Sequence, residues 1–229
     1  MGQRRENDCQ QARDEKVGEL GRAYAAAVLA GDEVAAERVI REAIEAGLSI
    51  AEVDEEIIAP ALWLVGELWE RGEISVADEH VATEISIRVL ALEREARRVA
   101  RVRPAYLAML AAPPGELHVV ALRMVAGVLR EAGYETMLVG ADVPAQALAA
   151  IAARHRPDVI CLSATMPGSG DQVMIAMDEV QRAWPKVSFL VGGRGLTSRF
   201  QAQPGVEICQ RVSEAVGAVD ALVQSARMN

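Results

Sequence analysis

The sequence predicts two structural classes in one chain: an all-α N-terminal part, built as a four-helix bundle, and an α/β C-terminal part with a doubly wound, five-stranded parallel sheet. Up to about residue 103, apolar residues recur every three or four positions, as on one face of a helix. After Pro104, short apolar runs alternate with helical patterns, as in parallel sheets covered by helices on both faces. We therefore expect a mobile N-terminal tail at 1–11, a helical-bundle domain at 12–101 and an α/β domain at 104–229.

Capping residues delimit the helices of the bundle. They are expected over residues 12–30, after Asp32 up to Gly47, after Ser49, and after Ser75. Pro60 predicts a kink or break in the third helix, because proline lacks the amide hydrogen that a helix interior uses.

The α/β part is expected to repeat a strand followed by a helix. Strands are expected at 105–112, 134–139, 158–164, 187–191 and 206–209, and helices near 118–132, 144–155, 171–184 and 212–227. This order predicts a flavodoxin-like (Rossmann-like) sheet. In such sheets, ligands bind beyond the carboxyl ends of the strands.

Composition excludes several classes of protein. The chain is 51% hydrophobic with a formal net charge of -9, so it has core material but no basic surface for nucleic acid. It contains no apolar run long enough for a membrane span and no signal peptide, so we expect a cytoplasmic protein. Its three cysteines form no C-x-x-C pair, which disfavours a disulfide framework or a zinc site.

His118 is the leading candidate for a ligand-binding side chain. It follows the first expected strand in the turn Pro-Pro-Gly-Glu-Leu-His, residues 113–118. A neutral imidazole can coordinate a transition metal, and Glu116 can hold the other ring nitrogen and so select the tautomer. By position alone, a surface turn with an incidental histidine remains the alternative.

Three motifs together resemble the cobalamin-binding domains of the methionine synthase type. These domains have D-x-H-x-x-G, then S-x-L about 41 residues later, then G-G 26 to 28 residues further on. The matching residues here are 116–121, 163–165 and 192–193, with gaps of 41 and 26 residues. The resemblance implies that His118 is the axial cobalt ligand. It also implies further cofactor-binding residues: Glu116, Leu117, Ser163, Thr165, Gly192 and Gly193.

The chain departs from this pattern at three positions. Glu116 replaces Asp, Ala121 replaces Gly and Thr165 replaces Leu. The methyl group of Ala121 could crowd the nucleotide tail of cobalamin, at a cost of about 1–3 kcal/mol. For the glycine pair at 192–193, an ordinary strand-to-loop turn is the alternative to a border of the tail channel.

Residues 64–80 resemble the helical cap of adenosylcobalamin photoreceptors of the CarH type, which carry a W-x9-E-H signature. Trp69, Glu79 and His80 match it, and Val76 shares a helix face with Glu79 and His80. The resemblance implies that Trp69 covers the upper face of the corrin while Glu79 and His80 bind the adenosyl group. The alternative is a core tryptophan beside a solvated Glu-His pair, with Trp63 as a competing core residue.

The light-sensing relatives have a histidine after the tryptophan that becomes a second cobalt ligand on illumination. Glu70 stands there instead, so we expect no bis-histidine photoproduct from that position. The resemblance implies a standalone light sensor without enzymatic activity. We expect it to bind adenosylcobalamin with His118 on cobalt, form a homodimer, and signal on photolysis to an effector protein that is still unknown, without itself binding DNA.

Standalone relatives called photocobilins also bind a bilin, which makes biliverdin a candidate second cofactor here. Cys161 lies within an expected strand, so a bilin would be held without a thioether bond. Two other functions stay open. One is a corrinoid protein that carries methyl groups between methyltransferases, and the other is a cobalamin storage or chaperone module.

Overall fold

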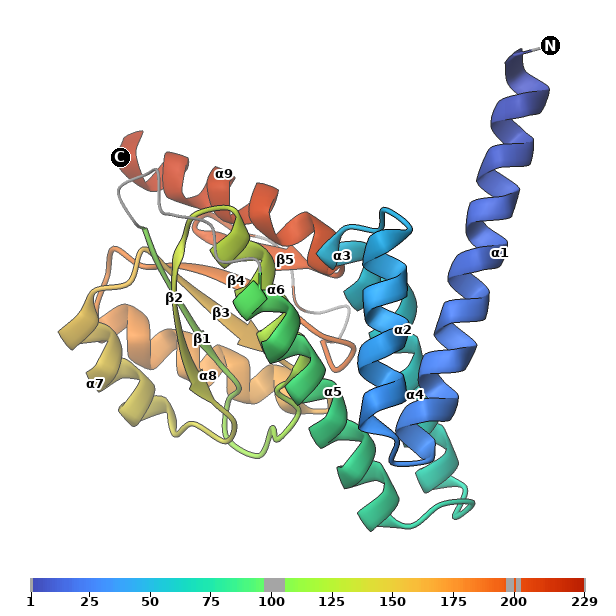
Figure 1. Ribbon diagram of the computed structural model, residues 1–229. Coiled ribbons are helices and arrows are strands. Elements are labelled where there is room, and N and C mark those ends of the chain that lie inside the picture. The colour runs from blue at the N-terminus through green and yellow to red at the C-terminus, as the bar shows by residue number, and fades with distance from the viewer. Residues whose placement is uncertain (1, 97–105, 197–199, 201–202, 229) are drawn as a thin grey trace. The chain divides into compact units, whose positions relative to one another are not determined.

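The computed structural model describes residues 2–96, 106–196, 200 and 203–228 of the 229-residue chain (Figure 1). The chain divides into two compact units, Met1–Ala96 and Arg97–Asn229. The first is helical and the second has a parallel sheet with helices, which is the fold class that the sequence predicts. The expected boundary at 101–104 lies outside the described residues.

Some segments of the helical unit are amphipathic or begin at a side-chain cap. Its described elements are α1 (Gly2–Leu29), α2 (Glu33–Glu45), α3 (Ile50–Val53), the π-helical segment η1 (Asp54–Ile58), α4 (Ala59–Glu70) and α5 (Val76–Ala96). In α2, the buried residues follow the spacing of one helix face: Ala36, Val39, Ile40 and Ala43. Asp32 accepts a hydrogen bond from the Ala35 N–H, and Ser49 forms a capping box with Glu52.

The break expected at Pro60 takes the form of a wider helical turn. Pro60 lies in the first turn of α4, and the π-helical segment η1 comes directly before that helix. Since proline cannot donate to a carbonyl in the preceding turn, the backbone widens there and then resumes an α-helix. The segments α3, η1 and α4 together occupy the place of the third expected helix.

Helix α1 begins ten residues earlier than expected. Residues 2–11, which we expected to form a tail, are helical. Polar pairs one turn apart support this segment: Gln10 donates to Asp14 at 2.8 Å and Gln11 to Glu15 at 3.2 Å. The expectation rested on apolar periodicity, which does not detect a helix without an apolar face.

The α/β unit has five parallel strands in the order β2-β1-β3-β4-β5. The strands are β1 (Leu107–Ala111), β2 (Glu135–Gly140), β3 (Val159–Ser163), β4 (Ser188–Gly192) and β5 (Val206–Cys209). The helices are α6 (Val120–Glu131), α7 (Ala145–His155), α8 (Ser169–Ala183) and α9 (Ala215–Met228), with a short 3₁₀ turn, η2 (Val212–Glu214). This strand order is that of the flavodoxin-like fold.

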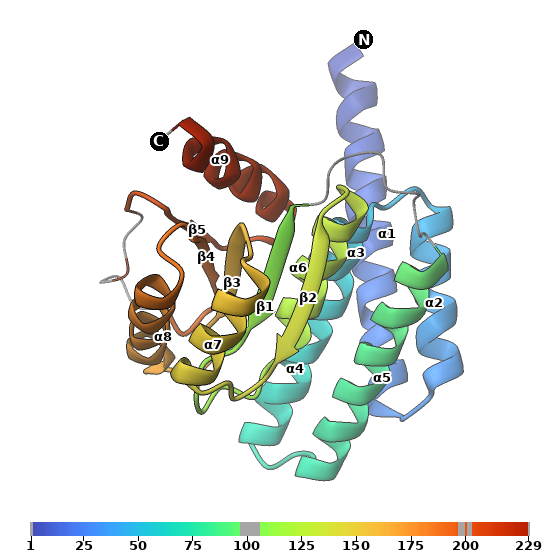
Figure 2. The same ribbon diagram turned by 90° about the vertical axis from the view of Figure 1, so that its left-hand side faces the viewer.

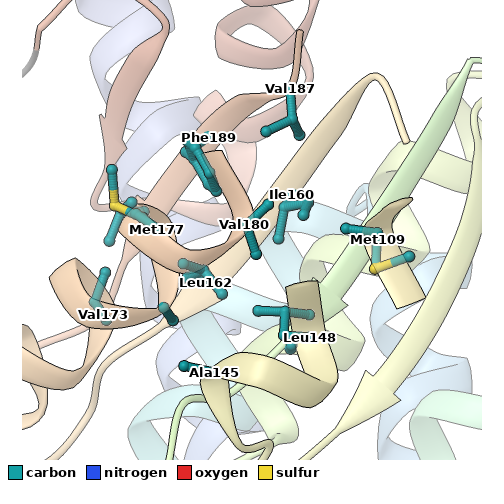
Figure 3. Packing of buried hydrophobic residues seen from close by; sticks show 14 of the residues in the cluster. Met109, Ala145, Leu148, Ile160, Leu162, Val173, Met177, Val180, Val187 and Phe189 are labelled. Carbon is teal, nitrogen blue, oxygen red and sulfur yellow. The ribbon is translucent and has the colours of Figure 1, made fainter. Parts of the chain in front are cut away.

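Helices cover both faces of the sheet, with α7 and α8 on one side and α6 and α9 on the other (Figure 2). Figure 3 shows the core on the α7 and α8 side, where Leu148 and Val180 meet Ile160, Leu162 and Phe189 from the strands. The central strands are buried on both faces, which explains their nearly continuous apolar sequences. Among the described residues, no helix is both long and apolar enough to span a membrane.

Candidate functional site

The segment between β1 and α6, residues 112–119, forms a loop at the carboxyl end of β1; we name it the His118 loop. It turns at Gly115, whose φ of 80° is easily reached only by glycine. The turn leaves the His118 side chain 54% exposed and buries Glu116 completely. The loop therefore presents an imidazole at the surface and holds a carboxylate beneath it.

The two carboxylate oxygens of Glu116 have different partners. Oε1 lies 2.6 Å from Nδ1 of His118 and accepts the His118 backbone N–H at 3.0 Å. Oε2 accepts the N–H groups of Thr165 at 2.6 Å and Met166 at 2.9 Å, and the Ser169 hydroxyl at 3.2 Å. Glu116 thus connects the His118 loop to the β3–α8 loop.

This hydrogen bonding holds Glu116 in its charged form. Burial alone would raise the pKa of Glu116, because the charge loses its hydration. The hydrogen bonds from the His118 ring and from the Met166, His118 and Thr165 N–H groups outweigh burial and lower this pKa to about 2. Glu116 is therefore a carboxylate at neutral pH.

The charge on Glu116 determines which nitrogen of His118 can bind a metal. An ionised carboxylate only accepts hydrogen bonds, so Nδ1 carries the hydrogen that faces it. In the neutral ring, Nε2 then has the lone pair that a metal needs. Within the described residues, no group of three or more His, Cys, Asp or Glu side chains is arranged to hold a metal ion.

The His118 loop and the β3–α8 loop expose apolar side chains. Leu117 is 68% exposed and Met166 is 47% exposed, and both belong to the loops that Glu116 joins. Ser163, at the end of β3, is 4% exposed, and its hydroxyl oxygen has no hydrogen-bond partner among the residues described. Because buried hydroxyls are normally paired, this oxygen suits a polar group of a bound molecule.

The glycine pair after β4 has a structural reason of its own. A Cβ atom on Gly192 would lie 2.6 Å from the Cys209 carbonyl oxygen, and one on Gly193 would lie 2.2 Å from that of Ala164. Gly193 also has a φ of 115°. Backbone packing therefore requires both glycines, as in the alternative of an ordinary strand-to-loop turn, and a role beside a nucleotide tail stays a prediction.

The candidates in the helical unit lie on the exposed α4–α5 hairpin. Trp69, near the end of α4, is 47% exposed, and Trp63 is 50% exposed, so neither is a fully buried core residue. Val76 is half-exposed and the His80 side chain is exposed, while Glu79 is less so. The Glu79 carboxylate accepts from the Thr83 hydroxyl at 2.9 Å and lies 2.5 Å from Nδ1 of His80.

The family model of the B12 binding domain matches residues 106–221, and a second B12 binding domain model matches residues 20–93. The chain belongs to the B12-binding domain family. Cobalamin is therefore its cofactor, as the resemblance implied.

Curated relatives of two kinds are similar to this B12-binding chain. The HTH-type transcriptional repressor CarH of Myxococcus xanthus is 31% identical over 160 residues, which are 69% of this chain and 50% of that protein. The chain thus spans half the length of CarH. Trimethylamine corrinoid protein 2 of Methanosarcina acetivorans is 26% identical over 200 residues, which are 85% of this chain and 92% of that protein.

A solved structure has the same fold as this B12-binding chain. The monomethylamine corrinoid protein of Methanosarcina barkeri aligns with a TM-score of 0.72 and 21% identity, covering 89% of this chain and 99% of that one.

Sequence reasoning missed three contributors to the site of this B12-binding domain. Met166 acts through its backbone N–H, as does Thr165, which the sequence had indicated only as a cofactor-binding residue, and a backbone contact cannot be recognised from the residue type. Ser169 binds Glu116 from the first residue of α8. Asp142, the second residue after β2, binds the His118 loop. An acidic residue at the carboxyl end of a strand was a signal that could have indicated it.

Proposed function

We propose that this protein is a cobalamin-dependent light sensor in which His118 is the axial cobalt ligand. The pairing of a half-exposed imidazole with a buried, charged Glu116 supports the ligand assignment, because it leaves Nε2 as the coordinating nitrogen. Leu117 and Met166 offer apolar contacts beside that ligand, and Ser163 offers an unpaired hydroxyl.

The exposure of Trp69 and His80 on one hairpin is the observation that carries the sensor proposal. Trp69 presents about half of its surface, so its ring is available to a ligand. Trp63 is similarly exposed, but Trp69 is the tryptophan that matches the W-x9-E-H signature. We infer that Trp69 and Val76 contact the upper face of the corrin, and that Glu79 and His80 hydrogen bond an adenosyl group. Adenosylcobalamin would supply a cobalt–carbon bond that light breaks.

If light released the adenosyl group, Glu79 and His80 would lose their hydrogen-bond partner. This loss would shift the protein between two conformations or assemblies. Glu70 is exposed at the end of α4 and offers no imidazole. A trapped photoproduct would therefore need water, His80 or a different chemistry in place of a histidine at that position. We infer that the output passes to an effector protein, by way of a homodimer.

A bilin such as biliverdin remains a candidate second chromophore. Cys161 and Cys209 are both buried, and burial raises the pKa of the Cys161 thiol well above its usual range. A protonated, buried thiol is a poor nucleophile for a thioether bond. Any bilin in contact with the α/β unit would therefore be held without a covalent bond to these residues.

The test is a comparison of the purified adenosylcobalamin complex in the dark and after green light. A sensor is expected to change its absorbance spectrum and its size or shape in solution. Trp69→Ala is expected to reduce the preference for adenosylcobalamin over methylcobalamin, and Trp63→Ala, which changes a tryptophan of similar exposure on the same helix, is the matched control. A light-stable spectrum, or equal effects of the two variants, would contradict the proposal.

A corrinoid methyl carrier is the second candidate. It is favoured by the match over 92% of trimethylamine corrinoid protein 2, compared with 50% of CarH. A carrier must present cobalt to a methyltransferase, so the methylated protein is expected to lose its methyl group when such an enzyme is added. Methyl transfer together with a light-stable spectrum would establish this candidate in place of the sensor.

A further inference from the structure

Asp142, in the β2–α7 loop, has an unusual backbone conformation. Its φ is 50°, and Arg156, with a φ of 53°, is the other non-glycine residue with a positive φ among those described. Side chains with a Cβ atom rarely adopt this left-handed region, although aspartate and asparagine tolerate it better than most. Such a conformation persists only where its surroundings hold it in place.

The contacts of Asp142 are with the His118 loop. Its Oδ1 accepts the Gly115 N–H at 2.8 Å, and its own N–H donates to the Glu116 carbonyl oxygen at 3.0 Å. The next residue, Val143, donates its N–H to the Ala112 carbonyl oxygen at 3.0 Å. The β2–α7 loop thus binds the backbone of the His118 loop before, at and after its turn.

A bulge at the end of β2 leads the chain into this position. The register pairs Leu110 with Leu138 but Ala111 with Gly140, so β2 has one extra residue there. The Gly140 carbonyl oxygen then accepts the Ala112 N–H at 2.8 Å. Bulges commonly redirect a strand end beside a functional site, and this one leads directly to Asp142.

We propose that Asp142 is a positioning residue for the axial-ligand loop. It fixes the backbone at Gly115 and Glu116, and so it sets where His118 presents its ring. This hold is separate from that of the Glu116 carboxylate, whose Oε2 partners belong to the β3–α8 loop. The proposal rests on the ligand role proposed for His118.

Three variants separate the hydrogen bond of Asp142 from its strain. Asp142→Asn keeps an oxygen acceptor and tolerates the left-handed backbone, so it is expected to behave like the wild type. Asp142→Ala loses the acceptor and keeps the strain. Asp142→Gly loses the acceptor but relieves the backbone strain. It is therefore expected to stay folded even if Asp142→Ala does not fold. Arg156→Gly relieves the same kind of strain at the end of α7 and is the matched control.

Two readouts are used, one of them without cofactor. In the apoprotein, hydrogen exchange of the Gly115 amide is expected to be about tenfold faster in Asp142→Gly and unchanged in Arg156→Gly. Asp142→Gly is expected to bind cobalamin about fivefold more weakly than the wild type, which corresponds to the loss of one net hydrogen bond. In its cobalamin complex, a smaller fraction of the cobalt is expected to be ligated by histidine. Asp142→Asn is expected to restore both.

The proposal would be overturned if the Gly115 amide of Asp142→Gly exchanged hydrogen at the wild-type rate. It would also be overturned if that amide exchanged faster while the variant kept the wild-type cobalamin affinity and spectrum. If His118→Ala had the wild-type cobalamin spectrum, the ligand assignment would fail instead. Faster Gly115 exchange in Asp142→Gly would then still establish that Asp142 holds the loop, so the two failures are distinguishable.

Discussion

Glu116→Gln removes the charge of Glu116 while nearly preserving its shape. Lowering the pKa of Glu116 from 4.5 to about 2 corresponds to about 3 kcal/mol of stability at neutral pH. A glutamine can turn its oxygen toward the Thr165 and Met166 amides, but its NH2 group then faces Nδ1 of His118. Nδ1 must become the acceptor and Nε2 must carry the hydrogen, so the ring can no longer ligate cobalt.

The sign of the pH dependence follows from the direction of the shift. Because folding lowers the pKa of Glu116, its contribution is complete above about pH 4.5 and is lost as the pH falls toward 2. The free energy of unfolding, measured by urea denaturation at pH 7, 4.5 and 3, should therefore differ between wild type and Glu116→Gln by about 3 kcal/mol at pH 7 and by less at pH 3.

Glu52→Gln is the control for a carboxylate outside the site. The hydrogen bonds of Ser49 lower the pKa of Glu52 as well, but its side chain is 40% exposed, so we expect an effect below about 1 kcal/mol. Nitrogen NMR of His118 would report the change of tautomer. The reasoning would be refuted if the free energies of unfolding of wild type and Glu116→Gln differed by the same amount at pH 7 and pH 3. An unchanged His118 tautomer in Glu116→Gln would also refute it.

Three further substitutions, one of them with a matched control variant, test the other residues. His118→Ala should abolish the His-ligated cobalamin spectrum and cost about 1 kcal/mol of stability, because the buried carboxylate keeps its backbone donors; an unchanged spectrum would exclude ligation. Trp69→Ala should lower the melting temperature little, since the side chain is half-exposed, while reducing the preference for adenosylcobalamin measured by titration. Gly193→Ala should lower the free energy of unfolding, measured by denaturation, by about 2–4 kcal/mol, because its Cβ would lie 2.2 Å from the Ala164 carbonyl oxygen. Gly217 lies on α9 with open space around it, so Gly217→Ala should raise the free energy of unfolding by up to about 1 kcal/mol. Equal effects of these two glycine variants would contradict the packing argument.

The fold followed from sequence patterns where burial is nearly complete. Strands β1, β3 and β4 are continuous apolar runs because both faces of the sheet are covered, and their observed ends lie within two residues of those expected. The short β5 was expected at its observed bounds, 206–209. The start of α1 was missed because its polar sequence has no apolar face to detect.

The sequence by itself determined the two-part fold, the loop that carries Glu116 and His118, and the spacing of the motifs, because apolar periodicity and turn residues are local properties of the chain. Only the tertiary structure decided what holds Glu116 and the His118 loop. The donors to Oε2 come from residues about 50 positions further along the chain, two of them as backbone amides, and Asp142 depends on a bulge and a positive φ. Such contacts depend on how separate strands end beside one another, which no local pattern records.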